Sequence, residues 1–166
     1  MLNCKNKDKS NGRFVKSEDV IVKFKRTTLT SKKPTKATEY SAGYDLYVDI
    51  GEPVIIKPHS TIILSSGIIT EIPKGYLGAI YARSGLSTKS GIRPATCVSI
   101  IDSDYRGVIG IPLHNDSEVD RIIAPYERVA QFIIHEIPKV ELKEVSSIDD
   151  FGKTERGDNG FGSSGK

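Results

Sequence analysis

The sequence predicts an all-β domain, and within that class a jelly-roll-like, distorted β-sandwich or barrel. Short runs of β-branched residues recur along the chain, broken by glycine, proline or aspartate at intervals typical of sandwiches and barrels. Helical spacing of apolar residues is nearly absent, so the chain lacks the crossover helices that would join parallel strands. We therefore expect antiparallel strands in a jelly roll or a related fold.

The expected strands follow one another from Val20 to Ile134. The first run, 20–24, reads Val-Ile-Val-Lys-Phe, and the segment 42–46 begins a second strand with alternating residues. Further strands are expected at 54–56, 61–64, 67–72, 76–81, 96–101, 108–113, 119–123 and 129–134. A single helical turn is expected at 84–90, and the glycines within and beside it keep it short.

The length of 166 residues suits one domain with its own core. We expect a basic N-terminal arm at 1–19, the β domain at 20–138, and a connecting segment with a glycine-rich, flexible arm at 139–166. No apolar run approaches the about 18 residues that span a bilayer, and the N-terminus lacks an apolar signal region. The expected location is the cytoplasm, or the nucleus if the source is eukaryotic or viral, and Cys4 and Cys97 are expected to be free thiols.

Charge is distributed unevenly along the chain. Residues 1–36 carry eleven Lys and Arg against three acids, whereas the remainder carries thirteen against eighteen. A basic arm can contact nucleic acid or a membrane surface, but such runs are more often simply solvated. The mildly acidic body disfavours a nucleic-acid partner, and we expect no membrane partner. A non-catalytic β-sandwich that binds a partner through its basic arm remains an alternative.

The last eleven residues, 156–166, are rich in glycine and predict a lid over a nucleotide. Glycine loses the most backbone entropy on ordering, so such a tail is mobile unless a ligand orders it. Its bare N–H groups can surround phosphate oxygens, Arg156 can bind two of them, and Phe161 can stack on a base. The run 160–165 matches G-x-G-x-x-G, but it lacks the preceding strand and following helix that this motif requires. A tail without function remains the alternative.

The segment 102–107, Asp-Ser-Asp-Tyr-Arg-Gly, lies between two β-branched runs. A strand that leads directly into Asp102 would hold its carboxylate rigidly, as a general base requires. Tyr105 could cover one side of a sugar. A tight turn, for which Asp and Gly are common, is the alternative interpretation.

The segment 81–91 ends a strand in Arg83 and several hydroxyl side chains, which suits a phosphate. An N-capped surface turn is the equally plain alternative. Ser84 is not expected to be a hydrolase nucleophile, because it lacks the G-x-S-x-G elbow and no histidine is marked as its base.

Metal chemistry is restricted by the residues available. The chain has no H-E-x-x-H motif and no Cys/His cluster, which disfavours zinc. Magnesium is usually held through substrate phosphates and one or two carboxylates, for which Asp45 is the candidate. Structural roles are the alternatives for these two segments: Asp45 could pair with a lysine, and Gln131 could make the hydrogen bonds of a buried strand edge.

Taken in order, five segments resemble the five motifs of the trimeric dUTPase (deoxyuridine triphosphatase) family. They are 42–46, 83–91, 101–107, 128–131 and 156–165. The resemblance implies a jelly-roll homotrimer whose active sites are shared between subunits. It also implies Mg²⁺-dependent hydrolysis of dUTP to dUMP and pyrophosphate, which limits uracil incorporation into DNA and supplies dUMP for dTMP synthesis. A dCTP deaminase of the same fold is the nearest alternative, but that family lacks such a tail.

The resemblance also implies a role for each matched residue. Asp102 would deprotonate the water that attacks the α-phosphorus, and Tyr105 would pack on the deoxyribose. Val98 and Ser99 would face the uracil edge, although Ser99 stands where glycine is usual. Asp45 would hold Mg²⁺ through water.

The other matched residues would bind the triphosphate and close the lid. Arg156 would hold the γ-phosphate and Phe161 would stack on uracil. The remaining substrate-binding residues implied in this way are Arg83, Ser84, Gly85, Gln131, Gly162, Ser163 and Ser164.

Overall fold

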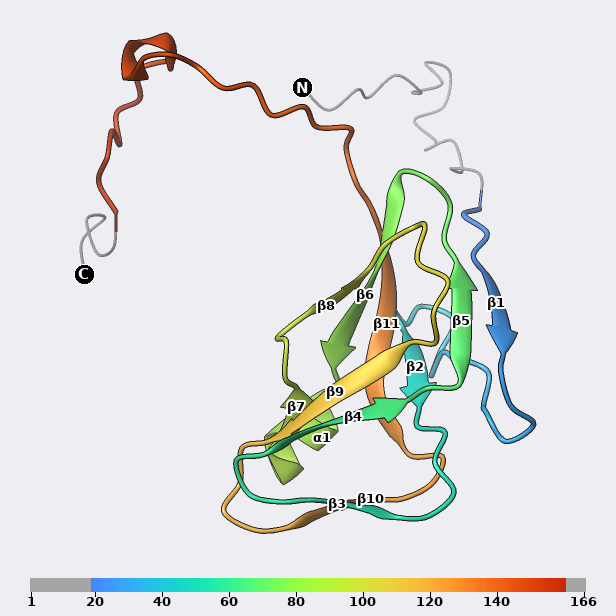
Figure 1. Cartoon of the computed structure of the whole chain (residues 1–166). Coiled ribbons are helices and arrows are strands. Elements are labelled where there is room, and N and C mark those ends of the chain that lie inside the picture. The colour runs from blue at the N-terminus through green and yellow to red at the C-terminus, as the bar shows by residue number, and fades with distance from the viewer. Residues whose placement is uncertain (1–18, 161–166) are drawn as a thin grey trace.

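The computed structural model describes residues 19–160, which are built almost entirely from antiparallel strands (Figure 1). A four-stranded sheet has the order β2 (Tyr44–Tyr47), β11 (Arg128–Glu136), β6 (Tyr76–Ala82), β8 (Ser99–Ile101). A three-stranded sheet has the order β4 (Thr61–Ser65), β9 (Gly110–Asn115), β7 (Ile92–Pro94). Two ribbons pair β1 (Lys23–Arg26) with β5 (Ile68–Glu71), and β3 (Val54–Ile56) with β10 (Arg121–Ile123). The prediction of an all-β, jelly-roll-like fold is confirmed.

The core consists of aliphatic side chains that alternate along the strands. In β9, Ile111 and Leu113 are buried and their neighbours are only partly buried, as expected when every second residue of a strand faces a core. In the long strand β11, Phe132 is buried and its ring lies against Gly78 of β6. A Cβ atom on Gly78 would collide with that ring, so the close approach of these two strands requires glycine.

The helix and most strands lie where the sequence predicts them. The helix α1 (Ser84–Ser90) has the expected bounds, and it ends at Gly91, whose φ of 66° is the left-handed conformation that favours glycine. The first strand begins at Lys23 instead of Val20, because only residues from Lys23 onward pair with β5.

The strand expected at 96–101 is wrong in its first half. Val98 N–H donates to the Thr96 carbonyl, and Cys97 has a φ of 59°, so this stretch turns and only β8 remains extended. Strand β7 and the short 3₁₀ helix η1 (Ile148–Asp150) were not predicted, because β7 has a single β-branched residue followed by Arg93 and Pro94, and η1 is only one turn long.

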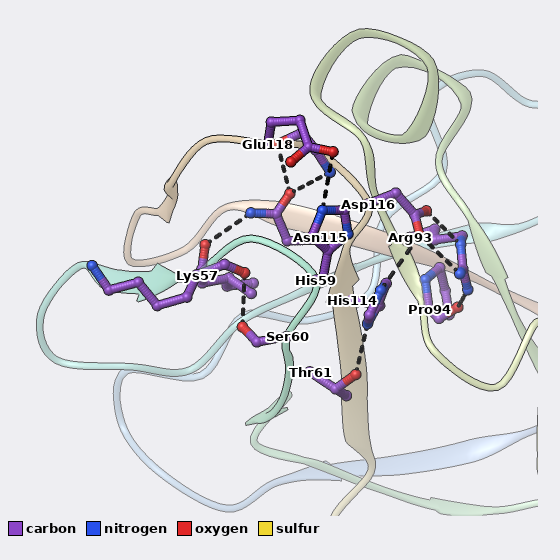
Figure 2. Close-up of polar contacts among 12 residues, drawn as sticks. Lys57, His59, Ser60, Thr61, Arg93, Pro94, His114, Asn115, Asp116 and Glu118 are labelled. Atoms are coloured by element: carbon purple, nitrogen blue, oxygen red, sulfur yellow. Dashed lines mark hydrogen bonds and ion pairs between the residues drawn. The ribbon is translucent and has the colours of Figure 1, made fainter.

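A polar cluster joins the ends of β4, β7 and β9 (Figure 2). The amide of Asn115 is fully buried, and its nitrogen donates to the carbonyls of Ile56 (2.9 Å) and Val119 (2.8 Å). Beside it, Arg93 donates to both carboxylate oxygens of Asp116 at 2.6 and 3.0 Å. Because every buried polar atom of Asn115 is satisfied, the cluster closes this end of the sheet without an energetic penalty.

After β11 the chain leaves the body of the domain, and the described part of this segment, 137–160, contains no strand (Figure 1). Its apolar side chains, such as Val140 and Leu142, are exposed. Nearly all of the predicted basic arm, 1–18, and the last six residues lie outside the described residues. None of the described helices is long and apolar enough to cross a membrane.

Candidate active site

The predicted site residues form two groups at opposite ends of β6. The register pairs Gly78 with Ile101, so Asp102 follows β8 at the N-terminal end of β6, whereas Arg83 directly follows the C-terminal end. Figure 1 shows α1 at one end of β6 and the segment after β8 at the other. Five residues separate Gly78 from Arg83, which is about 16 Å at the rise of a strand. A single chain therefore does not bring Asp102 and Arg83 into one site.

A groove of about 370 Å³ opens beside Asp102. Its walls combine aliphatic side chains with one carboxylate, one phenol and one hydroxyl. A groove of this size and chemistry suits a nucleoside, because apolar faces can cover base and sugar while a few polar groups fix the orientation. The residues that line it are Ile63, Ser99, Ile100, Ile101, Asp102, Tyr105, Gly110 and Pro112.

The loop after Asp102 places Tyr105 at the groove. The Tyr105 N–H donates to the Asp102 carbonyl at 3.1 Å, and its phenol donates to the Val108 carbonyl at 3.1 Å. A Cβ atom on Gly107 would collide with the tyrosine ring, so glycine allows the ring to lie against the backbone. Tyr105 is thus held through its backbone N–H and through its phenol before any ligand binds.

The same loop is closed by Arg106. Its guanidinium donates to the carbonyls of Ser103 (2.7 Å) and Tyr105 (2.9 Å). The Asp102 carboxylate is exposed, and within residues 19–160 no hydrogen bond or ion pair engages it. It can therefore accept a proton from a water molecule in the groove.

Of the two residues predicted to face the base, Ser99 lines the groove and Val98 does not. The Ser99 hydroxyl is hydrogen-bonded to that of Thr96, within its own hairpin. The Val98 N–H is used in the turn that precedes β8. The hairpin therefore presents the Ser99 side chain to the groove where glycine would leave it open.

At the opposite end of β6, Asp45 lies between two arginines. Its Oδ1 accepts from Arg83 Nε and its Oδ2 from Arg128 Nη1, both at 3.0 Å. The Asp45 side chain is 6% exposed, and those of Arg83 and Arg128 are 26% and 46% exposed. Gln131 is next to Asp45 in the β11–β2 register, so the structure brings three predicted residues together here.

Sequence reasoning missed Arg128. It singled out the segment 128–131 but assigned a role only to Gln131. The signal in the sequence was Arg128 itself, a cation at the start of a strand. Its contact with Asp45 arises only because β11 pairs with β2, the strand that carries Asp45.

Ser84 and Gly85 are exposed in the first turn of α1. The hydroxyls of Ser87 and Thr88 donate to carbonyls of the same turn, at Arg83 and Ser84. Ser84 has no histidine partner in the described part of the chain. The described histidines pair elsewhere: His59 with Glu118, His114 with Thr61 and Asp116, and His135 with Tyr81.

Comparison with known proteins identifies the family. The chain matches the dUTPase family over residues 30–165. This chain belongs to the dUTPase family. It is 43% identical to the deoxyuridine 5'-triphosphate nucleotidohydrolase of Orientia tsutsugamushi (strain Ikeda), over 82% of this chain and 90% of that protein. It is 41% identical to the enzyme of the same name from Candida albicans, over 81% and 82% of the two chains.

A solved structure supports the fold of this dUTPase family member. The Staphylococcus bacteriophage 80alpha dUTPase G164S mutant with dUpNHpp superimposes with a TM-score of 0.76. It is 26% identical in sequence, and the match covers 88% of this chain and 99% of the phage chain. The resemblance seen in the five sequence segments is thereby confirmed at the level of the family.

The described residues of this dUTPase family chain can hold magnesium only together with its substrate, because the phosphates must supply most of the ligands. Within residues 19–160, no group of three or more His, Cys, Asp and Glu could hold a metal ion. Asp45 uses each oxygen for one arginine, and each oxygen keeps a further lone pair that can accept from a metal-bound water. This donor set resembles that of Mg²⁺ sites completed by phosphates and water.

The predicted lid lies partly outside the described residues. Arg156 donates to the Asn159 carbonyl of its own arm at 2.9 Å. Phe161, Gly162, Ser163 and Ser164 lie beyond residue 160, so their predicted roles stay predictions.

Proposed function

We propose that this chain hydrolyses dUTP to dUMP and pyrophosphate. The observation that carries the proposal is the position of Asp102 in a chain of the dUTPase family. Its carboxylate, which has no partner within residues 19–160, follows a strand directly and lines a nucleoside-sized groove. The relatives from Orientia tsutsugamushi and Candida albicans are named for the same reaction.

In this reaction Asp102 takes a proton from a water molecule, whose oxygen then bonds to the α-phosphorus of dUTP. The bond from that phosphorus to the bridging oxygen breaks, and pyrophosphate leaves. Such chemistry depends mainly on positioning and on neutralising charge. Tyr105 packs against the deoxyribose, where a ribose 2'-hydroxyl would collide with its ring, and Ser99 lies beside the base.

The triphosphate binds at the cationic end of β6. Arg83 supplies charge there, and Ser84, Gly85 and Gln131 supply hydrogen bonds. When bound, Mg²⁺ neutralises phosphate charge, and Asp45 contacts its water shell. Support for this arrangement comes from the 26% and 46% exposure of Arg83 and Arg128, which leaves N–H groups available to a ligand.

The active site is completed by other copies of the chain in a homotrimer. The separation of about 16 Å between Gly78, the partner of Ile101, and Arg83 supports this, because it favours Asp102 and Arg83 of different copies acting on one substrate. The segment 139–166 reaches a further copy as a lid. There Arg156, Gly162, Ser163 and Ser164 bind terminal phosphates and Phe161 stacks on uracil.

In this assembly residues 20–138 form the catalytic domain, and residues 1–19 form an arm that catalysis does not require. The reaction limits uracil incorporation into DNA and supplies dUMP for dTMP synthesis. We place it in the cytoplasm, or in the nucleus of a eukaryotic or virus-infected cell.

A substrate panel tests the proposed function. The chain is offered dUTP, dCTP, dTTP and UTP with Mg²⁺, and the release of pyrophosphate and ammonia is followed. We expect pyrophosphate from dUTP alone and no ammonia. Ammonia from dCTP would indicate a deaminase, and binding of nucleic acid without any turnover would indicate a binding module.

A further inference from the structure

The segment between β7 and β8 connects two different sheets beside the groove. Strand β7 pairs with β9 in the three-stranded sheet, and β8 pairs with β6 in the four-stranded sheet. Just before the connection, the Ala95 N–H donates to the Pro112 carbonyl at 2.8 Å, and just after it Ser99 pairs with Ile80. Because both ends are anchored, residues 96–98 have little freedom in how they make the connection.

These three residues form a tight turn. The Val98 N–H donates to the Thr96 carbonyl at 2.6 Å, and Cys97 between them has a φ of 59°. A three-residue turn with a positive φ at its centre is rare and strained. The turn brings the hydroxyls of Thr96 and Ser99 together, and they form a hydrogen bond with each other.

The two hydroxyls have different surroundings. Thr96 is exposed, whereas Ser99 is partly buried and lines the groove beside Asp102. Among residues 19–160, Thr96 is the only hydrogen-bond partner of the Ser99 side chain. A ligand that fills the groove therefore covers Ser99 but leaves Thr96 in contact with water.

This difference determines what each hydroxyl costs when a ligand binds. A hydroxyl that is covered without a hydrogen-bond partner loses its water and gains nothing in return, which weakens binding. A covered hydroxyl that already has a partner avoids this loss. Removal of both members of a hydrogen-bonded pair is also nearly neutral, because no polar group is then left unpaired.

We infer that Thr96 is a positioning residue of the base pocket, which acts by holding and pairing the Ser99 hydroxyl. The inference rests on the proposed function, which places the uracil of dUTP beside Ser99. The bond to Thr96 turns the serine hydroxyl toward the turn, so the base can cover this side chain without leaving it unpaired. Thr96 thereby compensates for a side chain at the position where glycine is usual.

Three variants test the inference: Thr96→Val, Ser99→Ala and the double variant. Thr96→Val removes the hydroxyl and keeps the shape of the side chain. Thr38→Val is the matched control, because the Thr38 hydroxyl also pairs with a serine three residues later, Ser41, at 3.0 Å on the exposed surface. Circular dichroism and thermal melting establish that each variant is folded.

The first measurement is calorimetric affinity for dUpNHpp, dUMP and inorganic tripolyphosphate. In Thr96→Val we expect the Kd for dUpNHpp and for dUMP to rise by the same factor, about tenfold, because both ligands carry the base that covers Ser99. The Kd for tripolyphosphate, which has no base, should stay unchanged. In steady-state turnover of dUTP, KM should rise and kcat should stay near the wild-type value.

The second measurement is the same affinity in Ser99→Ala and in the double variant. Both should bind dUpNHpp within about twofold of the wild type, because neither leaves a covered hydroxyl without a partner. The substitution at Ser99 should therefore restore the affinity that Thr96→Val loses. Thr38→Val should bind as the wild type does.

Other outcomes contradict the inference. Unchanged affinity in Thr96→Val would show that Thr96 has no role at the groove, and an equal loss in the double variant would show that Thr96 acts independently of Ser99. A comparable loss in Ser99→Ala would show that the serine itself binds the base.

A loss of tripolyphosphate affinity, or a loss in Thr38→Val, would show an effect on the fold in general. If Thr96→Val fails to fold, Thr96→Ala removes the same hydroxyl with less apolar surface, and the same results are expected. A wild-type chain that binds dUMP but does not hydrolyse dUTP contradicts the proposed function instead.

Discussion

At the residue scale, two aspartates of this chain have opposite surroundings. Asp45 is buried and accepts hydrogen bonds from two guanidiniums, whereas Asp102 is exposed and unengaged within the described residues. Both oxygens of Asp45 are already occupied by guanidinium donors, whereas a water molecule can approach the Asp102 carboxylate. These surroundings are the reason why Asp102, and not Asp45, is proposed as the base.

Replacing Asp102 with asparagine should abolish proton acceptance without changing the shape of the side chain. We expect kcat to fall by about 10²- to 10⁴-fold, the usual contribution of a general base. The affinity for dUpNHpp should stay near that of the wild type. Turnover of dUTP and calorimetric binding measure the two quantities, and turnover near the wild-type value would remove the role assigned to Asp102.

Gly107→Ala should disturb the sugar side of the groove. The added Cβ collides with the Tyr105 ring, which must move away from the position held by its bond to Val108. We expect the preference for dUTP over UTP to fall by about tenfold, since such overpacking typically costs 1–3 kcal/mol. The measurement is kcat/KM for both nucleotides. Gly51→Ala is the control, because its Cβ would contact nothing.

The exposed Asp116 gives a pH-dependent contribution to stability. The hydrogen bond from Arg93 is the main cause that lowers the pKa of Asp116 below its ordinary value of 3.8, and the charges of Arg93, His114 and His59 add to it. Because the folded pKa is depressed, the stabilisation is present above pH 3.8 and is lost as the pH falls through the folded pKa.

We therefore expect Asp116→Asn to be less stable than the wild type near neutral pH. The difference should shrink toward zero in strong acid, and it should be small because the group is exposed. Denaturant unfolding at a series of pH values measures it, and a difference independent of pH would contradict the assignment.

At the scale of elements, β6 determines the geometry of the site. It pairs with β11, which carries Arg128 and Gln131, and with β8, which leads into Asp102. The arm that follows β11 contributes no buried side chain in its described part. The domain and the arm should therefore respond differently to truncation.

Removal of residues 156–166 should impair turnover without unfolding the domain. The lid would no longer exclude water or hold the terminal phosphates, so kcat/KM for dUTP should fall by about tenfold or more. The melting temperature should stay unchanged, because the described part of this segment is exposed and adds nothing to the core. Turnover equal to that of the full chain would contradict the proposed lid.

At the scale of the whole molecule, the separation of Asp102 and Arg83 predicts complementation between subunits. Asp102→Asn and Arg83→Gln should each be inactive alone. After subunit exchange in an equal mixture, about a quarter of all sites should regain activity, because these sites combine an intact Asp102 with an intact Arg83 from another copy. Turnover before and after mixing measures the effect. No recovery despite exchange, with exchange followed by mass, would show that each site uses one chain.

The sequence alone determined the fold class, the helix α1 and the family. Alternating β-branched runs and short polar motifs are local sequence patterns, and they can be recognised without knowledge of the tertiary contacts. The sequence did not predict the strand β7 or the turn before β8. Strand β7 has only one β-branched residue, and the turn lies inside a run that resembles a strand.

Only the tertiary structure decided which of the predicted residues meet. Asp45 contacts Arg83, 38 residues away, and Arg128, 83 residues away, because β2 pairs with β11 and β11 with β6. The same pairing placed Asp102 at the far end of β6 from Arg83. Strand pairing depends on the packing of the whole core, so no local pattern could have shown that Asp45 is held by two arginines or that Asp102 has no partner among residues 19–160.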